Sequence, residues 1–128
     1  MWEAYGWDNE DLLWASAALY GGIGGQTKGP CGAVASGAVC LGLRHRRPLT
    51  DMEAVARARQ DAFNEAGELA REFIEEFGAV SCYDLVGVDF GDKDAVERAV
   101  KEGRLARCHE FMRFVVEKLY ELEEKRAD

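Results

Sequence analysis

A glycine-dense loop that leads into a helix of small residues, residues 21–43, constrains the fold of this chain more than any other feature. No charged residue lies between Lys28 and Arg44, so the segment is expected to be buried. The amphipathic helices predicted elsewhere in the chain are the elements that can cover it.

The second half of this segment predicts a helix from Cys31 or Gly32 to Leu43. One face of that helix carries small residues at helical spacing, which another backbone could approach closely: Ala33, Ser36, Gly37 and Cys40. Gly37 and Gly42 each cost roughly 1 kcal/mol relative to alanine in a helix interior, which indicates that close packing is gained in return.

The loop before this helix lacks the features of a phosphate-binding loop. Thr27-Lys28-Gly29 reverses the residue order of a Walker A loop, G-x-G-x-x-G is absent, and a helix rather than a strand is predicted before it. Nucleotide binding is therefore not expected, and we interpret the glycines as packing residues.

Helical periodicity accounts for the rest of the chain, because no run of alternating apolar and polar residues occurs. We predict an all-α fold, a single-domain helical bundle of four main helices plus short ones over residues 1–128, with residues 1–7 and 123–128 frayed. The predicted helices cover residues 8–20, 31–43, 51–77, 82–85, 92–101 and 105–124. Their ends are expected at Asp8 or Asn9, a Thr50–Glu53 capping box, Gly78, Ser81 and Asp92.

Two of the predicted helices carry long apolar stripes. In the long helix the stripe, interrupted only by Arg59, is Met52, Val55, Ala56, Arg59, Ala62, Phe63, Ala66, Leu69, Ala70, Phe73 and Phe77. In the last helix it is Leu105, Cys108, Met112, Val115, Leu119 and Leu122, so Cys108 is expected to point inward.

The composition fits one domain and excludes a general nucleic-acid binder. The chain has 128 residues, 48% of them hydrophobic, and a net charge of −8, whereas phosphate neutralisation needs a basic surface. The one basic cluster, Arg44-His45-Arg46-Arg47, is interpreted as a solvated helix end, with an anionic ligand as the alternative.

The termini and apolar runs predict a cytoplasmic protein without membrane association. The first residues carry acids and no apolar run, unlike a secretory signal, and residues 30–43 are too short for a bilayer, which takes ~20 helical residues. In that compartment the four cysteines are expected as thiols, metal ligands or a redox pair rather than a disulfide framework.

Cysteine is the best candidate for chemistry. His45 and His109 are expected at exposed or edge positions, and no H-E-x-x-H, C-x-x-C or serine triad pattern occurs. Cys31 and Cys82 each follow a loop and open a helix, a setting that lowers a thiol pKa, and Cys108 would face them from the last helix. These three cysteines are the predicted catalytic and metal-ligating residues, whereas Cys40 is expected to act as a small apolar core residue.

The sequence around these cysteines resembles a known family. Gly29-Pro30-Cys31-Gly32-Ala33, the run from Phe77-Gly78 through Cys82 to Gly87, and Cys108 resemble the putative redox-active proteins named C_GCAxxG_C_C after their cysteines. A related domain occurs in split-Soret cytochromes. The resemblance implies an all-helical fold, redox chemistry with a redox partner protein, and an iron–sulfur cluster or zinc on the cysteines. Gly29 and Gly32, which flank Cys31, are the predicted cofactor-binding residues.

The chain departs from this family in two places. The family's first cysteine has no counterpart, since the region before the loop offers Trp2, Trp7 and Trp14 but no thiol, and Ser36 stands where glycine is expected. Cys40 cannot easily substitute, because nine residues at ~1.5 Å rise place it roughly 13 Å along the helix from Cys31. A fourth metal ligand would come from water, a small molecule, His109 or a second subunit, and covalent haem is not expected without C-x-x-C-H.

Three functions remain open from the sequence. The first is a redox or metal-binding protein that uses Cys31, Cys82 and Cys108. The second is a non-enzymatic helical assembly module, a homodimer that has lost a complete metal site and associates through its N-terminal tryptophans and long-helix stripe. The third is a small-molecule pocket over the glycine loop.

Overall fold

The computed structural model describes residues 1–127 and confirms the all-α class. The helices are α1 (Asp11–Trp14), α2 (Gly32–His45), α3 (Met52–Phe77), α4 (Cys82–Val86), α5 (Lys93–Lys101) and α6 (Arg107–Ala127), with a 3₁₀ turn at Arg104–Ala106. Among the described residues, the one extended pairing is an isolated antiparallel bridge between Pro30 and Ser81. No helix within residues 1–127 is long and apolar enough to cross a membrane.

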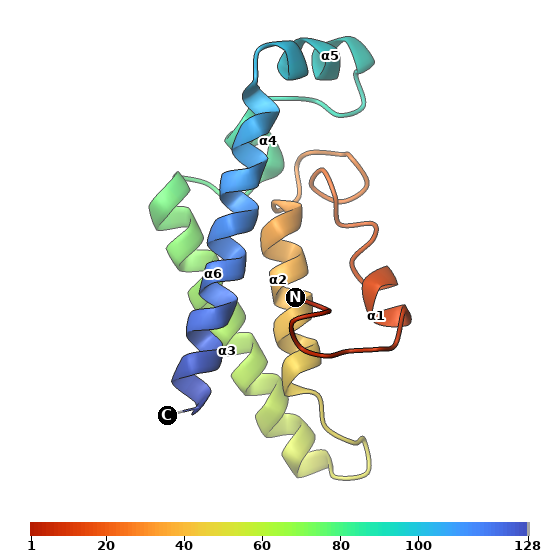
Figure 1. Ribbon diagram of the computed structural model, residues 1–128, viewed down its shortest axis with the longest axis vertical. Helices are drawn as coiled ribbons and strands as arrows, with labels where there is room; N and C mark the ends of the chain where they lie inside the picture. The colour runs from red at the N-terminus through yellow and green to blue at the C-terminus, as the bar shows by residue number, and fades with distance from the viewer. Residues whose placement is uncertain (128) are drawn as a thin grey trace.

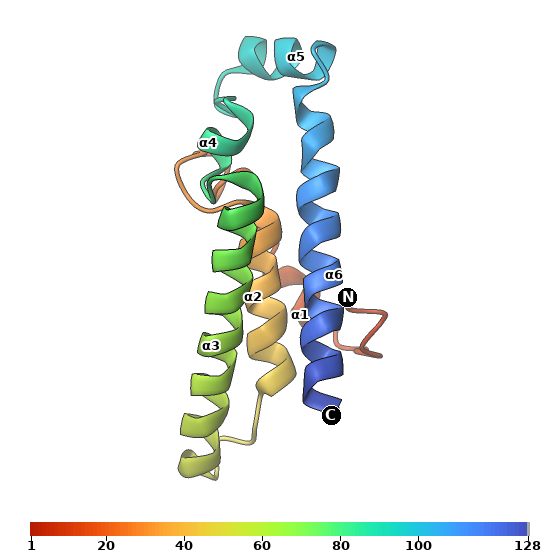
Figure 2. The same cartoon turned by 90° about the vertical axis from the view of Figure 1, so that its left-hand side faces the viewer.

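Three long helices, α2, α3 and α6, lie side by side and enclose the core (Figures 1 and 2). The short α5 crosses one end of this bundle, and α1 with the N-terminal segment flanks α2 (Figure 1). The largest fully buried side chains come from these three helices and the segment after α4: Phe73, Phe111, Leu41, Leu69, Leu119, Leu122 and Val88.

Gly37 explains how α2 fits between its partners. A Cβ at this position would come within 2.8 Å of Val115 on α6 and 2.9 Å of Leu69 on α3, so both helices pack against bare backbone. The prediction of close packing is confirmed at Gly37. It is wrong at Gly42, which is exposed and where a Cβ would meet nothing within 4 Å.

The expected first helix is much shorter than predicted. It ends at Trp14 rather than near Tyr20, and it contains no buried residue. Isolated short helices are unstable without an apolar face packed on a partner, and the exposed Trp14 does not supply one. The chain from there to the loop runs in turns.

Most predicted helix ends are confirmed. Ser81 Oγ accepts a hydrogen bond from Asp84 N, Asp92 caps α5, and Gly78 ends α3 in the left-handed conformation. At the start of α3 the cap is Asp51, whose carboxylate accepts from Ala54 N, so the capping box predicted from Thr50 is off by one residue. Helix α6 extends past the predicted end to Ala127.

The apolar stripe of α3 is only partly covered. Leu69 and Phe73 are fully buried, whereas Met52 and Phe63 are 64% and 74% exposed. On α6, Met112 is 47% exposed because it borders the pocket described below.

Candidate thiol site

The bridge between Pro30 and Ser81 brings the starts of α2 and α4 together. Cys31 N donates to Val80 O at 2.6 Å, and Cys82 N donates to Gly29 O at 3.0 Å. Successive side chains of extended backbone point to opposite faces. Cys31 follows Pro30 and Cys82 follows Ser81, so both cysteines lie on the face opposite to the Pro30 and Ser81 side chains. Two cysteines 51 positions apart in sequence thus open neighbouring helices.

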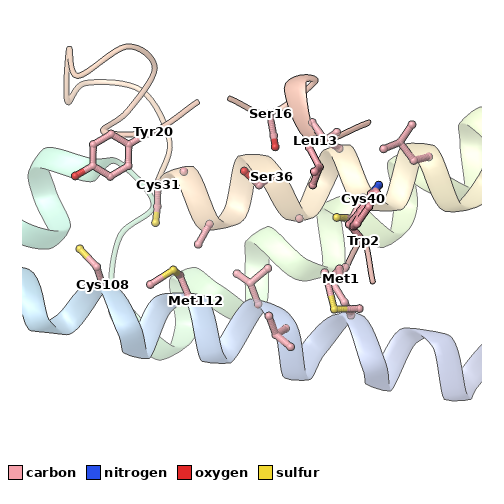
Figure 3. A pocket seen from close by; sticks show the side chains of 18 of the residues that line it. Met1, Trp2, Leu13, Ser16, Tyr20, Cys31, Ser36, Cys40, Cys108 and Met112 are labelled. Atoms are coloured by element: carbon pink, nitrogen blue, oxygen red, sulfur yellow. The ribbon is translucent and has the colours of Figure 1, made fainter. Parts of the chain in front are cut away.

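Cys108 faces this junction from the first turn of α6. Figure 3 shows the side chains of Cys31 and Cys108 on facing elements at one end of a pocket. Cys82 lines the same pocket, and the three side chains are close enough for their charges to interact. All three thiols are free and partly buried.

The pocket continues from the cysteines along α2 as an apolar cavity of about 520 Å³. None of the side chains that line it is charged: Met1, Trp2, Trp7, Leu12, Leu13, Ser16, Tyr20, Gly21, Cys31, Gly32, Ala33, Ser36, Gly37, Val39, Cys40, Leu43, Cys82, Phe90, Cys108, Met112, Val115, Val116 and Leu119. Ser16 and Ser36 line the middle of the pocket, and Met1, Trp2 and Cys40 lie at the end away from Cys31 (Figure 3).

Cys82 does not have the lowered pKa predicted for it. Burial, together with the nearby Cys31 and Cys108, raises the pKa of Cys82 to about 11. Burial and the charge of Cys31 likewise raise the pKa of Cys108.

The first turn of α4 explains why the helix start does not favour a thiolate. Its N–H groups already have acceptors: Cys82 N donates to Gly29 O, Tyr83 N to Thr27 O and Asp84 N to Ser81 Oγ. Because these donors are used and the helix has only five residues, little of the N-terminal dipole remains to offset desolvation.

The glycine loop packs tightly over the cysteines. Gly22 lies against Cys82, where a Cβ would approach the Cys82 Cβ to 3.0 Å, and a Cβ at Gly29 would meet Gly22 O at 2.7 Å. Gly32 lines the pocket and packs on Leu19, with 3.2 Å between a Cβ there and the Leu19 carbonyl oxygen. These contacts are backbone packing, and the predicted role of Gly29 and Gly32 in cofactor binding stays a prediction.

The loop achieves this packing through left-handed backbone. Residues with positive φ are Gly21, Gly22, Ile23, Gly24, Gly25 and Thr27. Thr27 is buried, and its backbone donates to Gly21 O and accepts from Tyr83 N, both at 2.8 Å. The loop is thereby fixed to the start of α4 beside Cys82.

Cys40 lies apart from the other cysteines, at the far end of the pocket (Figure 3). It is half-buried, and burial raises its pKa. It packs against the core cluster, as expected for a small apolar residue.

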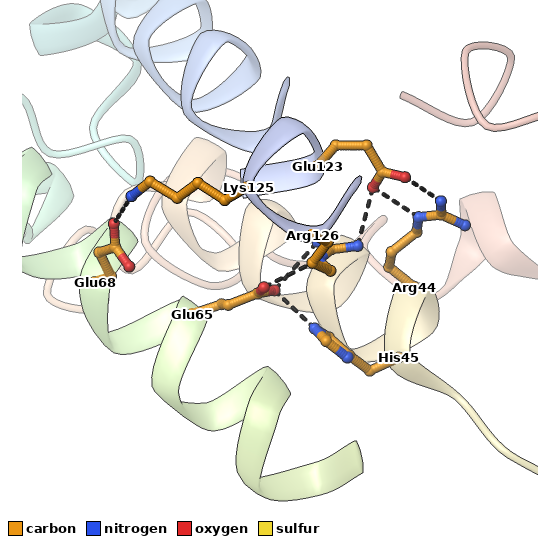
Figure 4. Close-up of polar contacts among 7 residues, drawn as sticks. All are labelled: Arg44, His45, Glu65, Glu68, Glu123, Lys125 and Arg126. Carbon is orange, nitrogen blue, oxygen red and sulfur yellow. Dashed lines mark hydrogen bonds and ion pairs between the residues drawn. The ribbon is translucent and has the colours of Figure 1, made fainter. Parts of the chain in front are cut away.

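Arg44, Arg46 and Arg47 are exposed at the end of α2, as predicted for a solvated helix end, and two of them also hold the wall at the far end of the pocket. The Arg44 guanidinium lies 5.2 Å from the Tyr5 ring centre and that of Arg46 lies 5.4 Å from the Trp7 ring centre, which ties the N-terminal segment to α2. Arg44 also pairs with Glu123 (Figure 4).

His45 is buried, so the expectation of an exposed or edge position is wrong. Its Nε2 lies 2.7 Å from Glu65 Oε2, and Arg126 binds the same carboxylate at 2.9 Å (Figure 4). The histidine therefore joins the ends of α2, α3 and α6 and lies outside the thiol site. His109 is exposed, as predicted.

The aromatic and hydroxyl residues of the pocket wall were missed from sequence. Trp2, Trp7, Ser16 and Tyr20 come from turns without helical periodicity, so no pattern assigns them a direction. Their only sequence signal was the unusual density of tryptophans near the N-terminus.

The cysteines as arranged do not fit a metal ion. Among residues 1–127, no three His, Cys, Asp or Glu side chains are grouped so that they could hold one ion. The donor set agrees with this, since Leu12, Leu13 and Ser16, rather than a fourth thiol, line the pocket from the segment before the loop.

Comparison with known proteins places the chain in a family. Residues 1–122 match the family described as Putative redox-active protein (C_GCAxxG_C_C). The resemblance seen in the sequence is thereby confirmed. No curated protein and no solved structure matches the chain significantly.

Proposed function

The chain belongs to the C_GCAxxG_C_C family, whose members are described as putative redox-active proteins, and from this premise we propose that it is a thiol-based redox protein working through Cys31, Cys82 and Cys108. The observation that carries the proposal is the meeting of these three thiols, from three separate elements, at one end of one pocket. Their mutual influence on pKa supports a single coupled site.

The redox step is reversible disulfide formation between Cys31 and Cys82. The Cys31 sulfur attacks a disulfide of a partner protein and releases one partner thiol, and the Cys82 sulfur then attacks Cys31 and releases the second. The protein loses two electrons and two protons, which the partner disulfide gains. Cys108, beside both sulfurs, is the third thiol that can reopen the bond.

The apolar surroundings shape this chemistry. Because burial raises the pKa of Cys82 and Cys108, both are mainly thiols near neutral pH, and exchange is slow until a partner or oxidant enters. Such a site is a stable reductant rather than a fast nucleophile.

Cysteine substitution tests this proposal. Reduced protein is treated anaerobically with oxidised glutathione and its free thiols are counted. Wild type and Cys40→Ser are expected to lose two thiols together by intramolecular bonding, whereas the double variant Cys31→Ser/Cys108→Ser, which leaves Cys82 without a neighbouring thiol, forms only mixed disulfides. Equal behaviour of the two variants would overturn the proposal.

A second candidate function is the binding of an iron–sulfur cluster or zinc by the same three cysteines. It is favoured by the clustering of three cysteines, but it requires these side chains to move closer and a fourth ligand to enter. Metal analysis and a visible spectrum of protein purified without oxygen test it, with Cys108→Ser as the variant that should lose the metal.

The alternative function is a non-enzymatic one, in which the protein forms a homodimer through α3. It is favoured by the exposed apolar residues Leu49, Met52 and Phe63, which are 78%, 64% and 74% exposed. Sedimentation of the wild type and Phe63→Glu tests it: a dimer that becomes a monomer supports this association, and a wild-type monomer overturns it.

A further inference from the structure

The pocket beside the thiols is larger than thiol–disulfide exchange requires. Its volume of about 520 Å³ is that of a site for a drug-sized molecule, and it follows α2 from Cys31 to Leu43. Leu43 follows Cys31 by 12 positions, which correspond to roughly 18 Å along the helix axis. The space therefore suits an elongated molecule with one end at the thiols.

The lining determines the chemical class of that molecule. Its side chains are uncharged, and four of them are aromatic: Trp2, Trp7, Tyr20 and Phe90. A phosphate-bearing or carboxylate group at the cysteine end would lose its hydration without gaining a cationic side chain, so an uncharged ligand suits this end. Aromatic walls favour a flat ring or an apolar chain.

Two features at defined positions add polar recognition. The hydroxyls of Ser16 and Ser36 stand midway along the pocket and can donate to a carbonyl oxygen (Figure 3). The sulfurs of Cys31 and Cys108 border the space at its end.

We propose that this pocket binds an apolar quinone and that the Cys31–Cys82 dithiol reduces it to the quinol. The inference rests on the proposed thiol redox function and names the substrate class of the same site. Two S–H bonds break, one S–S bond forms, and the quinone receives the two electrons and two protons as two O–H groups.

The chemistry of the site fits this acceptor. A dithiol reduces a quinone by giving up two electrons and two protons, and a quinone is uncharged both before and after accepting them. A nicotinamide or flavin nucleotide would instead bring phosphates into a cavity without a cationic side chain. In the proposed complex the quinone ring lies at the cysteine end with one carbonyl toward the serines, and an apolar tail follows α2.

The experiment uses decylubiquinone, whose fully substituted ring does not arylate thiols. Binding to the Cys31→Ser/Cys108→Ser variant, which lacks a dithiol at the site and cannot turn over, is measured by equilibrium dialysis, and quinol formation by reduced wild type is followed anaerobically by absorbance. One saturable site and one quinol per disulfide are expected.

Two substitutions of Ser36 distinguish the effect of filling the pocket from the effect of losing the serine hydrogen bond. Ser36→Leu fills the middle of the pocket and is expected to weaken binding at least tenfold, whereas Ser36→Ala keeps the space and is expected to weaken it less. Gly42→Ala, on the exposed side of the same helix, is the control and leaves binding unchanged. Ser16→Leu on the opposite wall gives a second blocking variant if Ser36→Leu does not fold.

The outcomes separate this inference from the proposed function. Unsaturable binding, or equal rates of quinol formation in wild type and the blocking variants, overturns the quinone site. If oxidised glutathione still forms the intramolecular disulfide in that case, the thiol redox function stands. If neither oxidant forms it, both proposals fail.

Discussion

Gly22 lies directly against Cys82: a Cβ on residue 22 would approach the Cβ of Cys82 to 3.0 Å and the backbone of Thr27 to 2.8 Å. The glycine loop and the thiol site are thus one packed unit, in which the loop backbone forms the cover of Cys82. This relationship leads to the first prediction.

Gly22→Ala is expected to destabilise the protein more than Gly24→Ala. Both positions have positive φ, which costs an alanine about 1–2 kcal/mol, but a Cβ at Gly24 meets nothing within 4 Å. The clash at Gly22 adds about 1–3 kcal/mol. Urea unfolding measures both values, and equal losses would contradict close packing of the loop on Cys82.

The reactivity of Cys82 is expected to rise far into the alkaline range. Because burial raises its pKa to about 11, the thiolate fraction and the alkylation rate still increase between pH 9 and pH 11. Alkylation by iodoacetamide, resolved by peptide mass spectrometry, follows this residue in the intact protein.

The variant Cys31→Ser provides the control for this pH profile. Removing the neighbouring negative charge is expected to move the Cys82 midpoint to lower pH. A wild-type rate that levels off below pH 9, or a midpoint unchanged in the variant, would contradict the coupling of these thiols.

Lys118→Met is expected to destabilise the fold near neutral pH and much less in acid. The Lys118 side chain is buried, and its Nζ lies 2.7 Å from Glu72 and 3.0 Å from Glu68. Removing the amine leaves carboxylates that remain partly exposed to water, so we expect a loss of about 1–2 kcal/mol.

The sign of this pH dependence follows from Glu68. Hydrogen bonds from Lys125 and Lys118 lower its pKa, so its ionised form stabilises the fold above its usual pKa, and that contribution is lost as pH falls through the lowered value. Unfolding measured at pH 7 and near pH 3 tests this. Lys101→Met, which removes an exposed pair with Glu97, should change stability little at either pH.

The fold was predictable where local signals agreed with tertiary packing. Helix starts are marked by the capping side chains of Ser81 and Asp92, and the end of α3 is marked by Gly78, which has no side chain. The helices α2 and α3 are in addition marked by their apolar residues. The segment before the loop misled the prediction because its apolar residues suggested a helix to Tyr20. Leu12 and Leu13 do lie in the short α1, but the chain beyond Trp14 runs in turns, from which Ser16 and Tyr20 line the pocket.

The position of Cys31, Cys82 and Cys108 on one pocket was predictable from the sequence, whereas the pKa of Cys82 was not, and the redox role of these residues stays a prediction. Cys31, Cys82 and Cys108 are marked by loop–helix junctions and by the family pattern. The direction of the pKa shift of Cys82 depends on which acceptors bind the first N–H groups of α4. These acceptors are the backbone carbonyls of residues 27 and 29, which tertiary folding brings to the start of the helix. Likewise, the burial of His45 depends on Glu65 from α3, which no local pattern indicates.

The most direct test of the account is peptide mapping of the protein equilibrated anaerobically across glutathione redox buffers. We predict a reversible bond between Cys31 and Cys82, exchange of that bond with Cys108, and a reduced Cys40 throughout. The absence of any intramolecular bond at every buffer ratio, or a bond that involves Cys40, would contradict the claim that these three cysteines form one redox site.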